Sequence, residues 1–380
     1  MKNPIDFSAS PVPLHVAVIS SSSYSPPWNE GVRNLTRRLV QDFSQRNTKV
    51  TIVTPKANAK QPFDEPSARL VEVTGLPEWQ GRHTWFTAFS HLFLLLRTSW
   101  VVRRLKPEPD VLLILASVTS VTGLRTKIYK WASRKPVVLY VTGLSRPRQG
   151  YNLGLKADKV LVGSDFLKGW FPGAEVIYPF LPLNVKPAGD YTREESVPFN
   201  VAFLGSFEPG RGVEFLLQAM ARVKEKTEKP VHLTIGWNGI CTENYPNINE
   251  LIDKLGIRSI VTIHGQVDTT HFYRQADVLV IPRLSQEYMS FPVRIVEAMA
   301  MQTPLIVTRV CGMENLIDGC GLSVAPGDVK GLAGAILELL DNPEMRTEFR
   351  QNCSIAIKRF GSQTSLDRLY EILRSLARHD

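Results

Sequence analysis

The sequence predicts an α/β protein with two doubly wound parallel-sheet domains. Short runs of β-branched and aliphatic residues alternate with longer polar–apolar stretches of helical character, and this alternation restarts halfway along the chain. Strands separated by helices form parallel sheets with right-handed crossovers. A length of 380 residues also favours two domains, since a domain takes about 150 residues. The 43% hydrophobic content is enough for two cores.

The first half of the chain is expected to form one sheet. Its β-branched and aliphatic runs predict strands at residues 16–20, 50–54, 111–115, 137–141 and 160–162. A polar–apolar pattern predicts a helix at residues 32–46. Residues 181–198 are rich in proline and polar residues and are expected to link the two domains.

The second half repeats the alternation. Strands are expected at residues 201–205, 231–236, 260–264, 278–281 and 305–308. Helices are expected at residues 213–226, 248–255, 293–301 and 329–340, and the tail at 343–377 predicts two more. In doubly wound folds, ligands bind beyond the carboxyl ends of the strands. We therefore expect the two domains to face each other across a ligand-binding cleft.

Composition excludes several classes of protein. The four cysteines form no CxxC pair and stand near no histidine cluster, which predicts free thiols in a reducing cytosol and no metal site. We expect no signal peptide in residues 1–13, and the apolar run 92–96 falls far short of the roughly 20 residues that a spanning helix needs. No helix-turn-helix or interleaved aromatic–basic motif indicates nucleic acid binding.

The net charge of +9 is concentrated in the first half, where residues 1–190 sum to +12 and residues 191–380 to −3. A basic half indicates an anionic partner, such as a phospholipid surface, a lipid phosphate or an acidic glycan. The alternative is that the basic surface only keeps the protein soluble.

The most informative stretch is residues 277–308. An apolar strand at 277–281 leads through a loop to a helix that opens near Pro292, with Arg294 in its first turn and Glu297 one and a half turns in. A helix that begins beyond a parallel strand offers N–H groups and a positive dipole end to an anion. Arginine adds a planar fork suited to phosphate.

This stretch resembles the Glu-x7-Glu region of retaining glycosyltransferases with the GT-B fold, and of the GT4 family in particular. Glu297 occupies the second Glu position, whereas Met289 stands at the first and Glu287 is out of register. The form Phe-Pro-x-basic-x-x-Glu resembles a variant subgroup of that family. The resemblance extends over residues 16–370 and is strongest at 200–341.

The resemblance implies a donor site for a nucleotide diphosphate sugar. Gly31 would lie against the donor phosphate, and Arg211 would neutralise the diphosphate, while Ser206 replaces a second cation that Arg211, Arg283 or Arg294 can supply. The other implied positions are Gly205 in the loop after the first strand of the second domain, Gly265 near the base, Phe291, Pro292 and Val293 at the donor helix, and Thr142, Gly143, Gly312 and Glu314 around the sugar, with Thr142 where the family often has His.

The resemblance further implies domains at residues 1–185 on the acceptor side and 186–360 on the donor side, with a helix at 361–380 that packs back on the first. The implied reaction is a retaining transfer from a UDP- or GDP-sugar to a glycan or lipid-linked acceptor, without metal or cofactor. Arg211 and Glu297 would be the catalytic residues. An epimerase or sugar-phosphate synthase is an alternative. So is a catalytically silent binding protein, which the departures Met289, Ser206 and Thr142 favour.

A long aromatic-rich helix is expected at residues 83–104. Its apolar face carries Trp85, Phe89, Leu92, Leu96 and Trp100, bordered by Arg97, Arg103 and Arg104, and the next helix carries Lys127, Lys130, Arg134 and Lys135. Such a helix can lie in a membrane interface, or it can simply cover the first sheet. These alternatives predict a cytoplasmic protein that is either free or peripheral at the inner face of a membrane.

Overall fold

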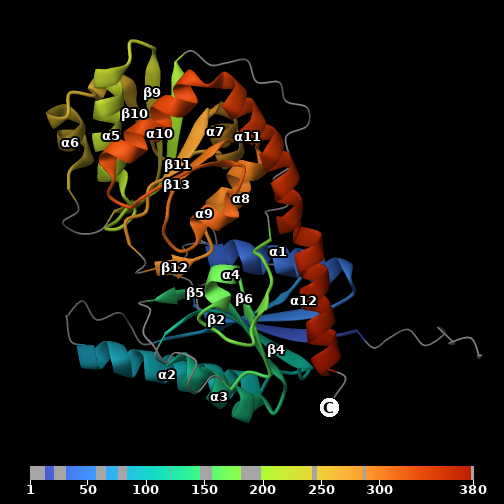
Figure 1. The fold of residues 1–380 in the computed structure, drawn as a ribbon. Coiled ribbons are helices and arrows are strands. Elements are labelled where there is room, and N and C mark those ends of the chain that lie inside the picture. Colours follow the sequence, from blue (N-terminus) through green and yellow to red (C-terminus); the bar gives the residue numbers. More distant parts are fainter. Residues whose placement is uncertain are drawn as a thin grey trace, which may run out of the picture. The chain divides into compact units, whose positions relative to one another are not determined.

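The computed structural model describes residues 13–20, 31–56, 66–75, 84–119, 121–145, 156–180, 198–241, 246–285 and 288–377. The chain divides into two compact units (Figure 1). The N-terminal unit comprises Met1–Leu144, Arg148–Tyr178 and Gln363–Asp380, and the C-terminal unit comprises Ser145–Pro147 and Pro179–Ser362. Residues 181–197 of the expected linker lie outside the described residues.

The N-terminal unit contains a parallel sheet with the strand order β3-β2-β1-β4-β5-β6-β7. Its central strand β1 is buried along its whole length, as expected for a parallel strand covered on both faces. The strands are β1 (His15–Ser20), β2 (Lys49–Pro55), β3 (Arg69–Val73), β4 (Val111–Val118), β5 (Val137–Ser145), β6 (Lys159–Val162) and β7 (Glu175–Val176). The helices are α1 (Gly31–Gln45), α2 (Thr84–Arg103), α3 (Thr122–Ser133) and α4 (Asp165–Lys168), with α12 (Ser362–Ala377) from the end of the chain.

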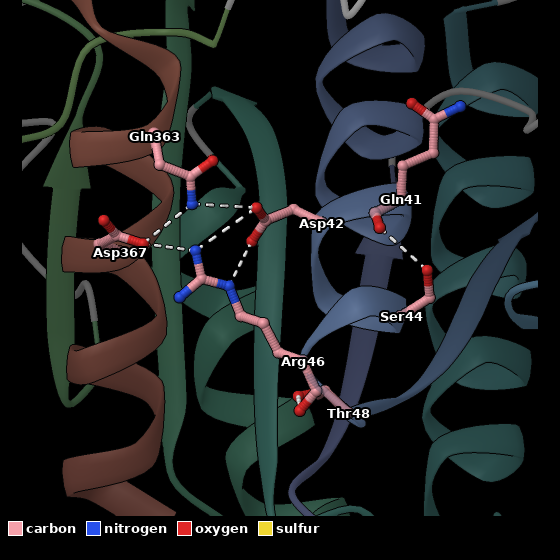
Figure 2. Close-up of polar contacts among 7 residues, drawn as sticks. All are labelled: Gln41, Asp42, Ser44, Arg46, Thr48, Gln363 and Asp367. Atoms are coloured by element: carbon pink, nitrogen blue, oxygen red, sulfur yellow. Dashed lines mark hydrogen bonds and ion pairs between the residues drawn. The ribbon is translucent and has the colours of Figure 1, made fainter.

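Helix α12 packs on α1 within the N-terminal unit, as Figure 2 shows. Arg46 directly follows α1, and its guanidinium forms an ion pair at 2.6 Å with Asp42 of that helix. It donates a second bond to Asp367 on α12. Next to this network, the rings of Phe43 and Tyr370 meet edge to face at 5.7 Å. The two helices are therefore joined by both a charged network and an aromatic contact.

The C-terminal unit contains a second parallel sheet, of order β10-β9-β8-β11-β13-β14. Its strands are β8 (Phe199–Phe207), β9 (Val231–Cys241), β10 (Val261–His264), β11 (Val278–Ile281), β13 (Leu305–Thr308) and β14 (Gly321–Val324), and the short β12 (Tyr288–Ser290) lies outside this sheet. The helices are α5 (Val213–Lys226), α6 (Ile248–Lys254), α7 (Thr269–Gln275), α8 (Val293–Ala300), α9 (Met313–Leu316), α10 (Val329–Asp341) and α11 (Pro343–Ala356), with 3₁₀ turns η1 (Arg258–Ile260) and η2 (Ile357–Phe360). Leu216 of α5, Val280 of β11 and Ile336 of α10 belong to the core of this unit.

The two predicted parallel sheets are confirmed, and the expected strands and helices are present with ends shifted by a few residues. The sequence did not predict the short elements β3, β7, β12, β14, α4, α7 and α9. No described helix has the length and apolar character needed to span a membrane. Among the described side chains, Cys311, Cys320 and Cys353 are free and buried.

Candidate functional site

The site begins at an irregularity in β8. The register of β8 against β9 shifts between Gly205 and Phe207, so Ser206 lies at a bulge just before the strand ends. Bulges next to functional sites redirect a side chain. The buried Ser206 hydroxyl donates a hydrogen bond to the carboxylate of Glu208 in the following loop. Ser206, predicted to replace a phosphate-binding cation, is thus tied to an acidic neighbour.

Two loops approach each other closely at the carboxyl ends of β8 and β11. Gly212 has a φ of 79°, and a Cβ there would lie 1.8 Å from the Pro282 carbonyl oxygen. The Leu284 amide donates a 2.9 Å hydrogen bond to the Gly210 carbonyl. Glycine at position 212 therefore allows the approach, which brings the loop of Arg211 beside the loop of Arg283.

Three arginines share this edge of the sheet. Burial, together with the positive charges of Arg211 and Arg294, lowers the pKa of Arg283 to about 10. Arg283 is 7% exposed, and its carbonyl accepts a 2.6 Å bond from the Thr308 hydroxyl of β13. Arg211 lies 3.4 Å from Glu208. A buried cation beside two others is a costly arrangement that a bound anion would stabilise.

Opposite Arg283 lies the loop that follows β13. Cys311 adopts a left-handed backbone with φ 57°, and Gly312 has φ 69° at the start of α9. Burial raises the pKa of the Cys311 thiol, while the charge of Arg283 opposes the rise. On α9, Glu314 Oε2 is buried without a hydrogen-bond partner among the described residues. A buried carboxylate oxygen in this state is suited to accept a bond from a ligand hydroxyl.

Helix α8 carries the predicted Glu297. Its carboxylate Oε2 accepts a 2.9 Å hydrogen bond from the Tyr273 hydroxyl of α7. Burial raises the pKa of Glu297, whereas the Tyr273 bond and the charge of Arg294 oppose the rise. Glu297 is thus oriented by a hydrogen bond from Tyr273 and lies near the positive charge of Arg294.

The start of α8 differs from the sequence prediction in one detail. Pro292 precedes the helix as its N-cap residue and offers no N–H. The Val293 amide donates a 2.9 Å bond back to the Phe291 carbonyl, and the Phe291 ring packs 6.0 Å from that of Phe360. The Val293 amide therefore does not point freely at an anion, because a local turn already uses it, and Arg294 is the charged group of this first turn.

The other predicted positions lie at strand or helix ends. Thr142 of β5 lies at a second register shift, because Val141 pairs with Ala116 and Gly143 with Ser117. The Thr142 hydroxyl lies 3.5 Å from that of Ser117. Thr142 and Gly143 belong to the N-terminal unit.

Gly31 is the first residue of α1 in the same unit, and the loop at residues 21–30 lies outside the described residues. Gly265 follows β10 in the C-terminal unit, with open space where a Cβ would stand. The side chain of Met289 is not among those that the structure describes.

Three further residues belong to the site and were not predicted. Glu208 contacts both Ser206 and Arg211, and its position three residues before Arg211 is a signal that the sequence contained. Tyr273 reaches Glu297 from 24 residues away, and Cys311 reaches Arg283 across two loops. No spacing rule connects such pairs. Within the described part of the chain, no group of three or more His, Cys, Asp or Glu side chains is placed to hold a metal.

Curated relatives match part of this chain. A D-inositol 3-phosphate glycosyltransferase 2 of Catenulispora acidiphila is 33% identical over 169 residues, which is 42% of this chain and 39% of that protein. An MMP alpha-(1->4)-mannosyltransferase of Mycolicibacterium hassiacum is also 33% identical, over 47% of this chain and 43% of its own length. The chain thus spans half or less of the length of these relatives.

Solved structures resemble the whole fold. A sucrose-phosphate synthase from Thermosynechococcus elongatus superposes with a TM-score of 0.75 at 18% identity, covering 97% of this chain and 100% of that one. Anabaena Alr3699/HepE in complex with UDP gives a TM-score of 0.71 at 16% identity, with 96% and 100% covered. These likenesses confirm the GT-B fold class of two Rossmann-like domains.

The C-terminal unit carries the family signal. The model of the family described as "Glycosyl transferases group 1" matches residues 198–342. This range includes the loops of Arg211 and Arg283, helix α8 with Arg294 and Glu297, and the segment with Glu314. Residues 198–342 are therefore similar to the group 1 glycosyltransferase family.

Proposed function

We propose that this protein is a retaining glycosyltransferase that moves a sugar from a nucleotide diphosphate sugar to a glycan or lipid-linked acceptor. The observation that carries the proposal is the cluster of Arg211, Arg283 and Arg294 beside Glu297. A cluster of guanidinium groups is suited to a diphosphate. Because Arg211 and Arg294 each lie close enough to Arg283 to lower its pKa, the three can together supply the positive charge that is missing at Ser206.

In the proposed reaction, the bond between the sugar C1 and the diphosphate oxygen breaks, and its electron pair stays on that oxygen. The acceptor hydroxyl oxygen forms the new bond to C1 on the same face of the sugar. The acceptor proton passes to the departing phosphate oxygen. The protein contributes by stabilising the growing negative charge and by positioning the two substrates.

The roles of the charged residues follow from this reaction. Arg211, Arg283 and Arg294 stabilise the diphosphate leaving group. Glu297, oriented by Tyr273, accepts hydrogen bonds from a ribose or sugar hydroxyl. Glu314 binds a second sugar hydroxyl, since its Oε2 is buried and accepts no bond from a described residue. It thereby provides a carboxylate for the sugar in place of the Glu that Met289 replaces.

UDP is the first donor nucleotide to test, because a structural neighbour contains UDP, and GDP is the second. Because arginines stabilise the charge of the leaving group, transfer is expected to continue in EDTA.

The reaction is expected to take place in the cytoplasm, either in solution or at the inner face of a membrane. An epimerase or sugar-phosphate synthase on this fold would bind the same donors and is separated by its products.

Calorimetric titration of the purified chain with UDP-, GDP- and ADP-sugars tests the proposal. We expect one donor to bind in the micromolar range and Arg211→Ala to abolish this binding. Arg222→Ala, which removes an exposed arginine of α5 from the same unit, is the matched control and should bind normally. Folded protein that binds none of the donors would instead favour a catalytically silent binding protein.

A further inference from the structure

Exposed apolar side chains gather on two helices of the N-terminal unit. On α2, the exposed fractions of Leu92, Leu96 and Trp100 are 46%, 55% and 55%. On α3, those of Leu124 and Trp131 are 50% and 71%. The two helices pack against each other (Figure 1). We call these five side chains the α2–α3 face.

The role of both helices in covering the sheet does not explain this face. Helix α2 buries Leu95 and Val102, and α3 buries Tyr129 and Ala132. The exposed residues follow a separate stripe, because positions four and seven residues apart share one side of a helix. Trp85 and Phe89, expected on the same stripe, have side chains outside the described set.

Cations lie directly on the exposed indole rings. The guanidinium of Arg104 is 4.2 Å from the ring centre of Trp100. That of Arg103, at the end of α2, is 5.8 Å from the ring centre of Trp131 on α3. Between residues 97 and 135, the chain carries nine Lys or Arg and two Asp or Glu. The α2–α3 face is thus apolar and aromatic, with Arg103 and Arg104 against its indole rings, and it belongs to a strongly basic segment of the chain.

We propose that the α2–α3 face docks on an anionic phospholipid bilayer. Indole rings favour the headgroup level of a bilayer, with the apolar ring inside and the N–H toward water. The surrounding Lys and Arg side chains are attracted by the negative surface potential of anionic lipids. Binding then depends on both terms, the buried apolar area and the charge.

The docked face gives the enzyme proposed above a direct route to its acceptor. If the protein transfers a sugar to a lipid-linked acceptor, docking would hold the N-terminal unit at the bilayer that carries this acceptor. This consequence rests on the proposed function, whereas the docking itself does not. The test is therefore carried out without donor or acceptor.

The test is co-sedimentation of the full chain with vesicles of phosphatidylcholine alone and of equal phosphatidylcholine and phosphatidylglycerol. We expect binding to the anionic vesicles, weak binding to the neutral ones, and weakening as NaCl is raised. The double variant Trp100→Ser with Trp131→Ser should bind about tenfold more weakly, since it removes two interfacial anchors. Ile355→Ser is the matched control, because Ile355 is 64% exposed on α11 of the other unit.

A second variant tests the charge. Arg104→Gln with Lys127→Gln keeps the apolar centre and should lose most of the preference for anionic vesicles. The proposal is overturned if the intact chain does not bind anionic vesicles, or if the double tryptophan variant binds them equally well. It is also overturned if that variant only converts a dimer to a monomer in light scattering, since a second copy would then cover the face.

These outcomes remain separate from those of the proposed function. None of the five substituted residues belongs to the donor loops, so donor binding by calorimetry should be unchanged in every variant. Loss of vesicle binding with intact donor binding supports docking on this face. Failure to bind any donor would overturn the enzyme proposal and leave the vesicle result standing.

Discussion

Tyr273 donates a hydrogen bond to Glu297 across 2.9 Å, from α7 to α8. The tyrosine is itself held at its backbone, because the Thr303 hydroxyl donates a 2.9 Å bond to the Tyr273 carbonyl. Burial and the nearby Glu297 raise the pKa of the Tyr273 hydroxyl well above its usual value, so it remains a donor at neutral pH. Tyr273 is therefore a positioning residue for the carboxylate that is proposed to bind a substrate hydroxyl.

Removal of the Tyr273 hydroxyl should weaken binding of the nucleotide sugar and shift the pH dependence of this binding. Tyr273→Phe leaves Glu297 without the hydrogen bond that opposes the rise of its pKa, so ionisation of the carboxyl moves to higher pH. We expect roughly tenfold weaker donor binding, the usual effect of losing one hydrogen bond to a charged group. Calorimetric titrations across the acid range provide the measurement.

The matched control for this change is Tyr370→Phe, since Tyr370 lies on α12 against Phe43 and far from α8 in sequence. It should keep the wild-type pH profile. An unshifted acid limb in Tyr273→Phe would show that the tyrosine serves only the packing of α7.

Glu297 also imposes a stability cost that depends on pH. Burial raises the folded-state pKa of Glu297, so folding favours the neutral carboxyl. The neutral carboxyl makes its full contribution to the free energy of unfolding below the usual pKa. This contribution is lost as the pH rises through the raised pKa. Glu297→Gln stays neutral at every pH. The variant should unfold at a higher temperature than wild type at neutral pH, match it in acid, and lose donor binding. A less stable variant at neutral pH would contradict this account.

The alternation of elements could be read from the sequence because it is a local property. The strands β1 and β8 are mostly apolar and mostly buried, and the strands 278–281 and 305–308 were predicted with their observed ends. The topological rule for doubly wound sheets then predicted that the loop of Arg211 and the helix of Glu297 lie at the carboxyl ends of the strands. From the sequence, Arg211, Arg283 and Arg294 were alternative candidates for the missing phosphate-binding cation. In the structure, Arg211 and Arg294 both lie near Arg283.

Features set by distant partners could not be predicted. Strand β14 was missed because its glycine looks like a loop residue, yet a Cβ on Gly321 would lie 1.9 Å from the Leu305 carbonyl of β13. The ion pair of Arg46 with Asp367 joins positions 321 residues apart. Tyr273 has no sequence signature of a positioning residue, since the contact arises only when α7 packs beside α8.

Arg283 should be more valuable for binding than for folding. Burial and the arginine neighbours lower its pKa to about 10. The charged guanidinium is therefore less stable in the folded protein than in the unfolded chain. Arg283→Met should therefore not lower the unfolding temperature of the free protein, but should weaken UDP binding by more than about tenfold. Thermal unfolding with and without UDP measures both effects, because a ligand stabilises only the fold that it binds.

Arg283→Lys is the informative partner variant. It keeps a positive charge but loses the planar fork, so intermediate UDP binding is expected. Nucleotide affinity of the wild type should also fall as pH rises through about 10, where the Arg283 guanidinium loses its proton. Equal stabilisation of wild type and Arg283→Met by UDP would exclude this residue from the phosphate site.

Gly212 should be intolerant of any side chain. In Gly212→Ala the new Cβ would meet the Pro282 carbonyl oxygen at 1.8 Å and would also occupy a φ of 79°, so the two donor loops must separate. We expect a loss of about 2–4 kcal/mol in the free energy of unfolding together with weaker donor binding. Gly256→Ala has a similar φ of 66° and no atom within 4 Å, so it should cost only about 1 kcal/mol. Urea unfolding of the two variants separates backbone strain from the clash.

Glu208 is the residue whose charge opposes the proposed ligand. Its carboxylate accepts bonds from Ser206 and Arg211, and a diphosphate bound by Arg211 would lie near this negative charge. Glu208→Gln keeps an acceptor oxygen for Ser206 and removes the charge. UDP should then bind about three- to tenfold more tightly at low salt, by the Coulomb energy of partly exposed charges, and the gain should shrink in high salt.

Two further variants distinguish charge from positioning at this residue. Glu208→Ala removes the acceptor as well, so it should bind UDP less tightly than Glu208→Gln if the acceptor orients Ser206 and Arg211. Glu214→Gln removes a carboxylate from the first turn of α5 and controls for the general change in charge. If Glu208→Gln binds UDP more weakly than wild type, the carboxylate serves mainly to hold Arg211 in place, and its negative charge is then required in the site rather than opposed to the ligand.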